Sequence, residues 1–222
     1  MCMCDTTYQF WNERTPENFD MTTKRSGRIE AISKMAAIAK PYLSRKNAVT
    51  IDLGCGTGLF AAIAGLKTII GIDFSIPLLK VACQRMQTVL QQSIFAPGFV
   101  KKSVDNVVSL FVIDDYPTEK KREFFMQIWS LMRPGGRVFF AAYSPNDERM
   151  GPLKETVNAQ SHMEFTIYLE SAASYEAMFQ EVGFLIEHTE LLTTPGVYAK
   201  GMHHIPVTRE FILMVAEKPR NL

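Results

Sequence analysis

Two carboxylates and a set of glycines between residues 52 and 73 form the stretch of this sequence best suited to chemistry. Asp52 ends an apolar run and is followed by glycines at positions 54, 56 and 58. Such glycines let a backbone turn pass close to a ligand. A second apolar run ends at Asp73, about twenty residues after the turn, where doubly wound folds place a carboxylate that binds ribose hydroxyls. The pattern therefore predicts a ligand that carries a ribose.

The glycine spacing helps to distinguish between ribose-bearing ligands. Nicotinamide dinucleotide sites use G-x-G-x-x-G, whereas the third glycine comes one residue early in this chain and is followed by Leu59. An acidic residue two positions before the first glycine is also foreign to the dinucleotide pattern. Asp52 suits a ligand with positive charge near the turn. We therefore expect S-adenosylmethionine, which carries an ammonium and a sulfonium group, in preference to a pyrophosphate.

The elements that must position these residues alternate between strand and helix patterns. Apolar runs at 48–51 and 67–72 predict buried strands, and the helix between them, at 59–64, is expected to stop at Gly65. A helix at 29–39 is expected to stop at Pro41. Further helices are expected at 76–90, 119–132 and 174–182, and further strands at 107–113, 137–142, 184–192 and 211–216. The alternation predicts an α/β fold with a doubly wound, mostly parallel sheet.

Four motifs in the right order resemble those of the class I S-adenosylmethionine-dependent methyltransferases. I-D-L-G-C-G-T-G at 51–58 and G-I-D-F-S at 71–75 are similar to the first two motifs of that family. S-V-D-N-V-V-S-L-F-V-I-D-D at 103–115 is similar to its fourth strand, and L-M-R-P-G-G-R-V-F-F at 131–140 to the turn that enters its fifth. The resemblance implies a Rossmann-like sheet of seven strands with helices on both faces. It also implies S-adenosylmethionine as methyl donor and S-adenosylhomocysteine as product.

The same resemblance assigns roles around the cofactor. Asp52 is expected to hold its ammonium group and Asp73 its ribose, while Phe74 either packs on the adenine or belongs to the core. Family members usually carry an acid that accepts the adenine amino group, but Gln92 and Ser93 stand there, and neutral acceptors bind more weakly. The third strand, near 90–94, is not placed by this pattern. The expected cofactor-binding residues are Asp52, Gly54, Cys55, Gly56, Gly58, Asp73, Phe74, Ser75, Gln92, Ser93, Ser109 and Leu110.

Methyl transfer from a sulfonium is an in-line displacement, so the protein has mainly to position the reacting groups. A general base is needed only where the acceptor must lose a proton early. The candidates are Asp114 and Asp115 after the fourth strand, and His203 and His204 in a loop before the last strand. Histidine titrates near neutral pH and suits this role. Alternatively, the two aspartates start a turn and cap the next helix, and the histidines are surface residues.

Extra chain at 145–170 and 193–209 is expected beside the carboxyl ends of the strands, where open α/β sheets bind ligands. Both segments are rich in apolar and aromatic residues, which predicts a small aromatic or amphipathic acceptor. We expect methylation of a nitrogen or oxygen atom in the synthesis of a specialised metabolite. The expected substrate-binding residues are Tyr8, Trp11, Tyr116, Tyr143, His162, Phe165, Tyr198 and Met202.

The chain is expected to form one domain over residues 1–222, with a helical lid at 1–45, a cofactor-binding core at 46–145 and substrate-side segments at 146–222. Two alternatives stay open. A protein or peptide methyltransferase would have an open groove over the strand ends. A non-enzymatic binding module would be favoured by loss of Asp73 or of the glycines, and all of these are retained.

Charge, apolar runs and cysteine spacing limit the kinds of partner that the chain is expected to bind. The formal net charge is +1, and no Lys/Arg run exceeds three residues, whereas nucleic-acid binding normally needs a basic surface. We therefore expect no nucleic-acid partner. With no signal-peptide pattern and no apolar run of membrane length, we expect a cytoplasmic protein without a membrane partner. The four cysteines have neither zinc-site nor disulfide spacing, so no metal is expected. Oligomeric state is not predicted.

Overall fold

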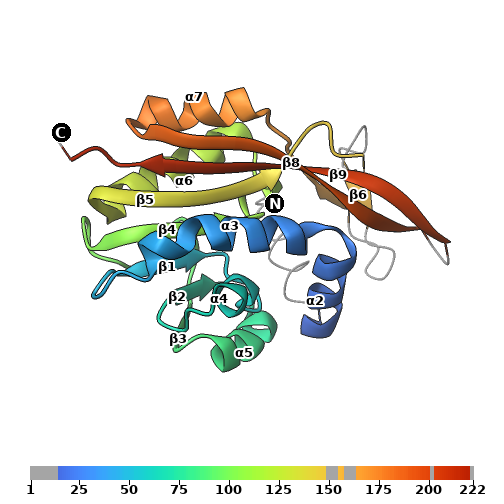
Figure 1. Ribbon diagram of the computed structural model, residues 1–222, viewed down its shortest axis with the longest axis horizontal. Helices are drawn as coiled ribbons and strands as arrows, with labels where there is room; N and C mark the ends of the chain where they lie inside the picture. Colours follow the sequence, from blue (N-terminus) through green and yellow to red (C-terminus); the bar gives the residue numbers. More distant parts are fainter. Residues whose placement is uncertain (1–14, 149–154, 158–163, 201–202, 221–222) are drawn as a thin grey trace.

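The computed structural model describes residues 15–148, 155–157, 164–200 and 203–220. Its centre is a sheet of seven strands in the order β3-β2-β1-β4-β5-β9-β8 (Figure 1). The pairs from β3 to β5 are parallel, and β9 runs antiparallel to both β5 and β8. The strands are β1 (Thr50–Leu53), β2 (Ile70–Asp73), β3 (Thr88–Gln91), β4 (Val104–Leu110), β5 (Met132–Tyr143), β8 (Leu185–Lys200) and β9 (His203–Glu217). The predicted α/β fold with a doubly wound, mostly parallel sheet is confirmed.

Helices cover both faces of this sheet because β5 and its neighbours are apolar on both sides. On β5, Phe139 and Ala141 belong to one buried cluster, while Val138 and Phe140 belong to the other, as the two-residue period of a strand requires. The first cluster contains α3 (Arg28–Leu43), α4 (Leu59–Ala64) and α5 (Ile76–Arg85). The second contains α6 (Thr118–Leu131) and α7 (Ala172–Val182). Helix α4 ends at Gly65, which adopts the left-handed conformation with φ 70°, as predicted.

The region after α5 differs from the predicted helix at 76–90. Helix α5 ends at Arg85, Met86 is extended, and Thr88–Gln91 forms β3 against β2, with Ile70 opposite Thr88. The strand was hidden because it is short and only half-buried, so it shows no apolar alternation. Its hydrogen bonds to β2, which involve residues distant in sequence, decide its conformation.

Two further boundaries are corrected near the ends of elements. Helix α3 continues through Pro41 to Leu43, because a proline in the last turn removes a single hydrogen bond while Ala39 and Leu43 remain buried. Strand β4 begins three residues before the predicted 107–113 and ends at Leu110. The residues that follow, Ile113–Asp115, form a short 3-10 turn.

Another helix, α2 (Pro16–Arg25), precedes α3 in the part of the chain expected to form a lid. Thr15 is its N-cap and accepts a hydrogen bond from the backbone N–H of Asn18, and Pro16 occupies the first helical position. These signals lie in a polar stretch with few apolar positions. The helix contacts α3 and α5, and its Asp20 is hydrogen-bonded to Thr57 of the glycine turn.

Strands β8 and β9 form a long hairpin whose outer part replaces the loop expected at 193–209. The two strands pair from Leu185–Glu217 out to Lys200–His203, whereas β9 pairs with β5 only from Phe211 onwards. Residues 203–210 therefore extend beyond the sheet by roughly 26 Å at about 3.3 Å per residue. Figure 1 shows this extension projecting past β5. A separate ladder joins β6 (Glu155–Val157) to β7 (Glu164–Thr166) within the expected segment at 145–170.

None of the helices in the described ranges is both long enough and apolar enough to cross a membrane. The expected substrate residues Tyr8, Trp11, His162 and Met202 lie outside the described residues. Phe165 and Tyr198 lie in β7 and β8, where the structure describes the backbone.

Candidate active site

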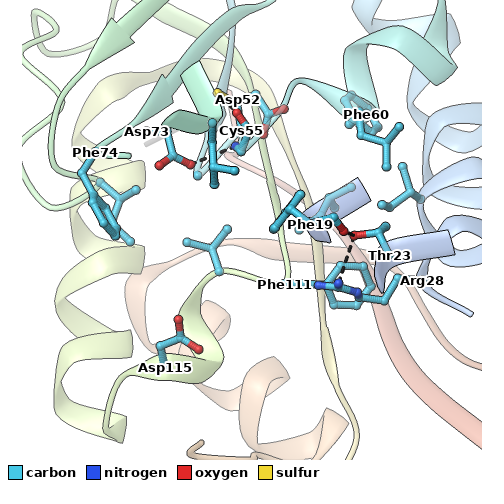
Figure 2. Close-up of a pocket in the computed structure, with 18 of the residues that line it drawn as sticks. Phe19, Thr23, Arg28, Asp52, Cys55, Phe60, Asp73, Phe74, Phe111 and Asp115 are labelled. Carbon is cyan, nitrogen blue, oxygen red and sulfur yellow. Dashed lines mark hydrogen bonds between the residues drawn. The ribbon is translucent and has the colours of Figure 1, made fainter. Parts of the chain in front are cut away.

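A cavity lies at the carboxyl ends of β1, β2 and β4, where the order of the strands reverses and open α/β sheets bind their ligands. It contains about 880 Å³ of space between protein atoms, including a part open to solvent. Figure 2 shows that residues from α2, α3, the glycine turn and the segment after β4 surround it. Its walls are mostly apolar, and four acidic or basic side chains line it: Arg28, Asp52, Asp73 and Asp115.

The glycine turn after β1 has the backbone that its sequence predicts. Gly54, Gly56 and Gly58 have φ values of 76°, 53° and 74°, in the left-handed region. A Cβ on Gly54 would lie 2.4 Å from Cγ2 of Val112, so a side chain there is excluded. The N–H groups of Gly54 and Cys55 both donate to the carbonyl oxygen of Ile72, at 2.8 and 3.0 Å. The turn is therefore fixed to β2 with its backbone exposed to the cavity.

Asp73 connects this turn to α5. One of its carboxylate oxygens, Oδ2, accepts the N–H of Gly56 at 2.9 Å, and Oδ1 accepts the N–H of Ser75 at 2.9 Å. Burial raises the pKa of Asp73, and the backbone hydrogen bonds partly offset that rise. Asp73 also lines the cavity, and each carboxylate oxygen can accept a second hydrogen bond. The ribose contact expected of Asp73 stays a prediction.

Asp52 is the group whose environment points most directly to a ligand. The residue is 2% exposed and lines the cavity, and its Oδ2 atom has no hydrogen-bond partner among the described residues. Burial, together with the charge of nearby Asp73, raises the pKa of Asp52 to about 8. Buried polar atoms are nearly always hydrogen-bonded, so an unpaired carboxylate oxygen at a cavity indicates a site for a cation or a donor.

The other expected cofactor residues divide into two groups. Cys55, Phe74 and Leu110 line the cavity. Five others do not contribute to its wall: Gly58, Ser75, Gln92, Ser93 and Ser109. The side-chain amide of Gln92 lies beside Gly98, and its Oε1 is buried without a partner among the described residues. Ile94, two residues further on, lines the cavity instead. The expected adenine contact of Gln92 or Ser93 therefore gains no support from the geometry.

Asp114 and Asp115 face different surroundings although they are adjacent. Asp114 is 1% exposed and accepts hydrogen bonds from Tyr175 Oη at 3.0 Å and from the N–H of Tyr143 at 3.3 Å. Burial raises its pKa to about 6, although nearby Lys121 lowers it. It does not line the cavity, so its expected catalytic role gains no support from the geometry and stays a prediction. Asp115 lines the cavity beside Tyr116, and its expected catalytic role stays a prediction.

The remaining candidates lie further from the cavity. Tyr143 is 7% exposed, and its ring packs on Phe111 and Phe211, with centroids 5.2 and 5.9 Å away. His203 and His204 are the first residues of β9 and pair with Lys200 and Ala199 at the outer end of the hairpin. The loop predicted for them is wrong. Their place at the outer end of the hairpin separates them from the end of β5 by the length of the extension described above.

Several cavity residues were missed from the sequence. Phe19, Thr23, Arg28 and Ile32 come from α2 and α3, and Phe111 follows β4 with a left-handed φ of 60°. Such a backbone conformation is rare for a bulky residue, and residues held in it cluster at functional sites. The start signals of α2 at Thr15 and Pro16 predict a helix. They do not reveal which side chains of that helix reach the glycine turn.

A polar latch fixes α2 over the turn. Thr57 Oγ1 donates to Asp20 Oδ1 at 2.5 Å, and Arg85 Nη2 donates to Asp20 Oδ2 at 2.6 Å. Arg85 also donates to the carbonyl oxygen of Thr57 at 3.1 Å. The three residues belong to α2, the glycine turn and α5, so the latch joins the expected lid to the cofactor-binding core.

Metal binding gains no positive indication. Within the described ranges there is no group of three or more His, Cys, Asp or Glu side chains arranged to hold an ion. The expectation of a metal-free site stays a prediction.

Known proteins similar to this chain are methyltransferases. A family model described as a methyltransferase domain matches residues 51–140. A demethylmenaquinone methyltransferase from Lactiplantibacillus plantarum is 28% identical over 173 residues, covering 64% of this chain and 72% of that protein. A tRNA (carboxymethyluridine(34)-5-O)-methyltransferase from Arabidopsis thaliana is 27% identical over 124 residues, covering 55% of this chain. The match spans only 30% of the Arabidopsis enzyme.

Solved structures share the fold at low sequence identity. The magnesium protoporphyrin IX methyltransferase from Synechocystis PCC 6803, solved with bound SAH, has a TM-score of 0.66 at 18% identity. The match covers 95% of this chain and 99% of that one. A putative methyltransferase from Bacillus halodurans C-125 has a TM-score of 0.65 at 16% identity and covers 85% of this chain and 98% of its own.

Proposed function

We propose that the chain is a class I S-adenosylmethionine-dependent methyltransferase and that it methylates a small, largely apolar acceptor. The observation that carries the cofactor assignment is the unpaired Oδ2 atom of Asp52 at the wall of the cavity. An ammonium group would supply the missing partner and the opposite charge. A pyrophosphate would place negative charge beside a carboxylate.

The residues of the cavity fit the parts of this cofactor. Asp52 would hold the ammonium group, the backbone of the glycine turn would pass beside the methionine portion, and Asp73 would accept the ribose hydroxyls. Phe74 lines the cavity on the Asp73 side and would pack on the adenine. When bound, the cofactor supplies a methyl group on a positively charged sulfur. The protein then contributes position and water exclusion, and alignment of reacting groups lowers a barrier by roughly 7–11 kcal/mol.

The lining of the cavity supports a small apolar acceptor. Ile32, Phe60, Phe111 and Val112 supply apolar surface, and Asp115 and Tyr116 supply polar groups at the end of β4. Such a lining is typical of sites for small molecules. Two of the similar proteins are named for small-molecule acceptors, demethylmenaquinone and magnesium protoporphyrin IX. We propose Asp115 as the group that orients the acceptor, and nitrogen or oxygen of a specialised metabolite as the methylated atom.

RNA is the alternative raised by the Arabidopsis relative, which is named for tRNA. The near-neutral charge of this chain opposes it, because phosphate binding depends on clustered Lys and Arg. The shared region also spans less than a third of that relative. We therefore expect small molecules to be the acceptors, and the experiment below includes RNA as a separate arm.

The test is transfer of a labelled methyl group from S-adenosylmethionine by the purified full chain. The acceptor pools are a small-molecule extract, total protein and total tRNA. We expect label in the small-molecule pool, and loss of that label in Asp52→Asn. The matched control is Asp105→Asn, which changes the same side chain at the opposite, amino end of β4. Label confined to protein or to tRNA would refute the proposed acceptor class.

A further inference from the structure

Arg28 brings a positive charge to the cavity that the described residues leave without an acidic partner. The residue is 6% exposed and lines the cavity. Its Nε donates to Ser26 Oγ at 3.1 Å, and its Nη2 donates to Thr23 Oγ1 at 2.9 Å. The guanidinium carbon lies 5.7 Å from the centre of the Phe19 ring. In the described part of the chain, no carboxylate lies within 4.0 Å of this guanidinium.

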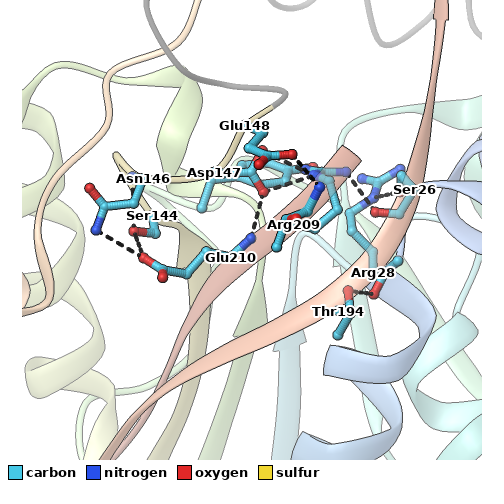
Figure 3. A network of polar contacts seen from close by, with 12 residues as sticks. Ser26, Arg28, Ser144, Asn146, Asp147, Glu148, Thr194, Arg209 and Glu210 are labelled. Carbon is cyan, nitrogen blue, oxygen red and sulfur yellow. Dashed lines mark hydrogen bonds and ion pairs between the residues drawn. The ribbon is translucent and has the colours of Figure 1, made fainter. Parts of the chain in front are cut away.

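A second buried arginine nearby, Arg209, is paired with a carboxylate. Arg209 is fully buried, and its Nε lies 2.7 and 3.0 Å from the two carboxylate oxygens of Asp147. Its Nη1 donates to the carbonyl oxygen of Ser26 at 2.6 Å. Figure 3 shows Arg28 and Arg209 meeting at Ser26. Asp147 pairs directly with Arg209, whereas Arg28 has no such carboxylate partner among the described residues.

We infer that Arg28 binds a carboxylate of the ligand that occupies the cavity. A guanidinium has five N–H groups, and hydroxyls take two of them here, which leaves enough donors for a carboxylate. A buried charge is costly unless it is paired, so a carboxylate bound at Arg28 gains both hydrogen bonds and charge compensation. The hydroxyls of Thr23 and Ser26 orient the guanidinium for this contact.

The inference deepens the proposed function and rests on it. Two groups of the reacting molecules offer the required chemistry: the methionine carboxylate of the cofactor and an acidic group on the acceptor. Arg28 lies over the ring of Phe19, and Phe19 in turn contacts the glycine turn, where the cofactor would bind. The Cζ atom of Phe19 lies 3.1 Å from the position that a Cβ on Gly56 would occupy. The same arginine lies at the apolar end formed by Ile32 and Phe111, where an acceptor would bind.

Calorimetric titration of the full chain separates these sources. The first pair of ligands is S-adenosylhomocysteine and its decarboxylated analogue, which keeps the amine. The second pair, titrated at saturating S-adenosylhomocysteine, is 1-naphthoate and the neutral 1-naphthamide. Each ligand is titrated into wild type, Arg28→Met and Arg28→Lys. Arg25→Met, on the exposed part of α2, is the matched control. Circular dichroism checks that each variant is folded.

We expect Arg28→Met to lower the affinity for one of the two carboxylate ligands by roughly 10- to 100-fold and to leave the affinity for its neutral analogue unchanged. Loss confined to S-adenosylhomocysteine identifies the cofactor carboxylate, and loss confined to 1-naphthoate identifies an acidic acceptor. Arg28→Lys should regain part of the affinity in either case, and Arg25→Met should match wild type. Equal affinities of wild type and Arg28→Met for both carboxylates would overturn this inference alone. Failure of wild type to bind S-adenosylhomocysteine would overturn the proposed function as well.

Discussion

At the scale of single residues, Asp52 is a carboxylate that the fold keeps out of water. Two effects act in the same direction on it: burial disfavours its charge, and so does the neighbouring Asp73. Its pKa of about 8 means that the carboxyl group is mainly protonated at neutral pH before a ligand binds. A cationic ligand reverses this preference, so ligand binding and proton release are coupled.

The coupling predicts how cofactor affinity depends on pH. Below about pH 8, binding of S-adenosylhomocysteine should release a proton from Asp52, so affinity should rise from pH 6 towards pH 8. Titration in buffers of different ionisation enthalpy measures the released proton directly. Asp52→Asn should bind weakly and lose this release. An unchanged proton release in Asp52→Asn would show that another group titrates.

Burial of the Asp52 carboxylate should lower the unfolding free energy of the protein without ligand. The pKa of Asp52 is about 8 in the folded protein, above the ordinary value of 3.8. Its contribution to the free energy of unfolding is therefore most favourable below pH 3.8 and is lost as the pH rises towards 8. Asp52→Asn should therefore unfold at higher urea than wild type at pH 8, by a free energy on the order of a few kcal/mol. At pH 5 the difference should shrink. A constant difference across this range would contradict the assignment.

Among the elements, the latch joins α2, in the part of the chain expected to form a lid, to the glycine turn and α5. Asp20 accepts hydrogen bonds from Thr57 and Arg85, and the side chains of the Asp20–Arg85 pair are 18% and 28% exposed. This partial burial makes the pair stronger than a surface ion pair and weaker than a fully buried one. Helix α2 also carries Phe19 and Thr23 into the cavity.

Weakening the latch should therefore lower the affinity of the cavity for its ligand. Asp20→Asn keeps the shape of the side chain but removes its charge, so we expect affinity for S-adenosylhomocysteine to fall by about 0.5–1.5 kcal/mol. Glu17→Gln, on an exposed position of the same helix, should leave the affinity unchanged. Calorimetry measures both. Equal affinities of Asp20→Asn and wild type would mean that α2 does not contribute to cofactor binding through this contact.

Features set by neighbouring residues could be predicted from the sequence, whereas features set by contacts between distant residues could not. Gly65 ends α4 because its left-handed conformation is a local preference, and the glycine turn lies beside Asp73 because β1 and β2 are adjacent. Strand β3 depends on pairing with β2 and has no strong pattern of its own. The contact of Phe19 with the glycine turn joins distant parts of the chain, so composition and spacing could not reveal it. The histidines were misplaced for the same reason.

At the scale of the whole molecule, the hairpin of β8 and β9 closes against the turn between α2 and α3. Thr194 Oγ1 donates to the carbonyl oxygen of Gly27 at 3.2 Å, and Arg209 donates to that of Ser26. A Cβ on Gly27 would lie 2.4 Å from Thr194 Oγ1, so only glycine allows this approach. The carboxyl-terminal strands thereby support the amino-terminal helices that cover the cavity.

The buried pair of Arg209 and Asp147 should carry much of this support. Asp147→Asn leaves Arg209 charged and uncompensated, and breaking a fully buried pair costs about 3–5 kcal/mol of unfolding free energy. Urea unfolding measures this loss. Arg209→Met combined with Asp147→Asn removes both charges and should recover part of the stability. If the double variant were less stable than the sum of the two single changes predicts, charge pairing would not explain the effect.

We propose that the cavity binds S-adenosylmethionine through Asp52. The most direct measurement is parallel calorimetric titration of the full chain with S-adenosylmethionine, S-adenosylhomocysteine and NAD. We expect micromolar binding of the first two ligands, no heat from NAD, and strongly reduced binding of the first two to Asp52→Asn. Binding of NAD alone, or undiminished binding of S-adenosylmethionine to Asp52→Asn, would contradict it.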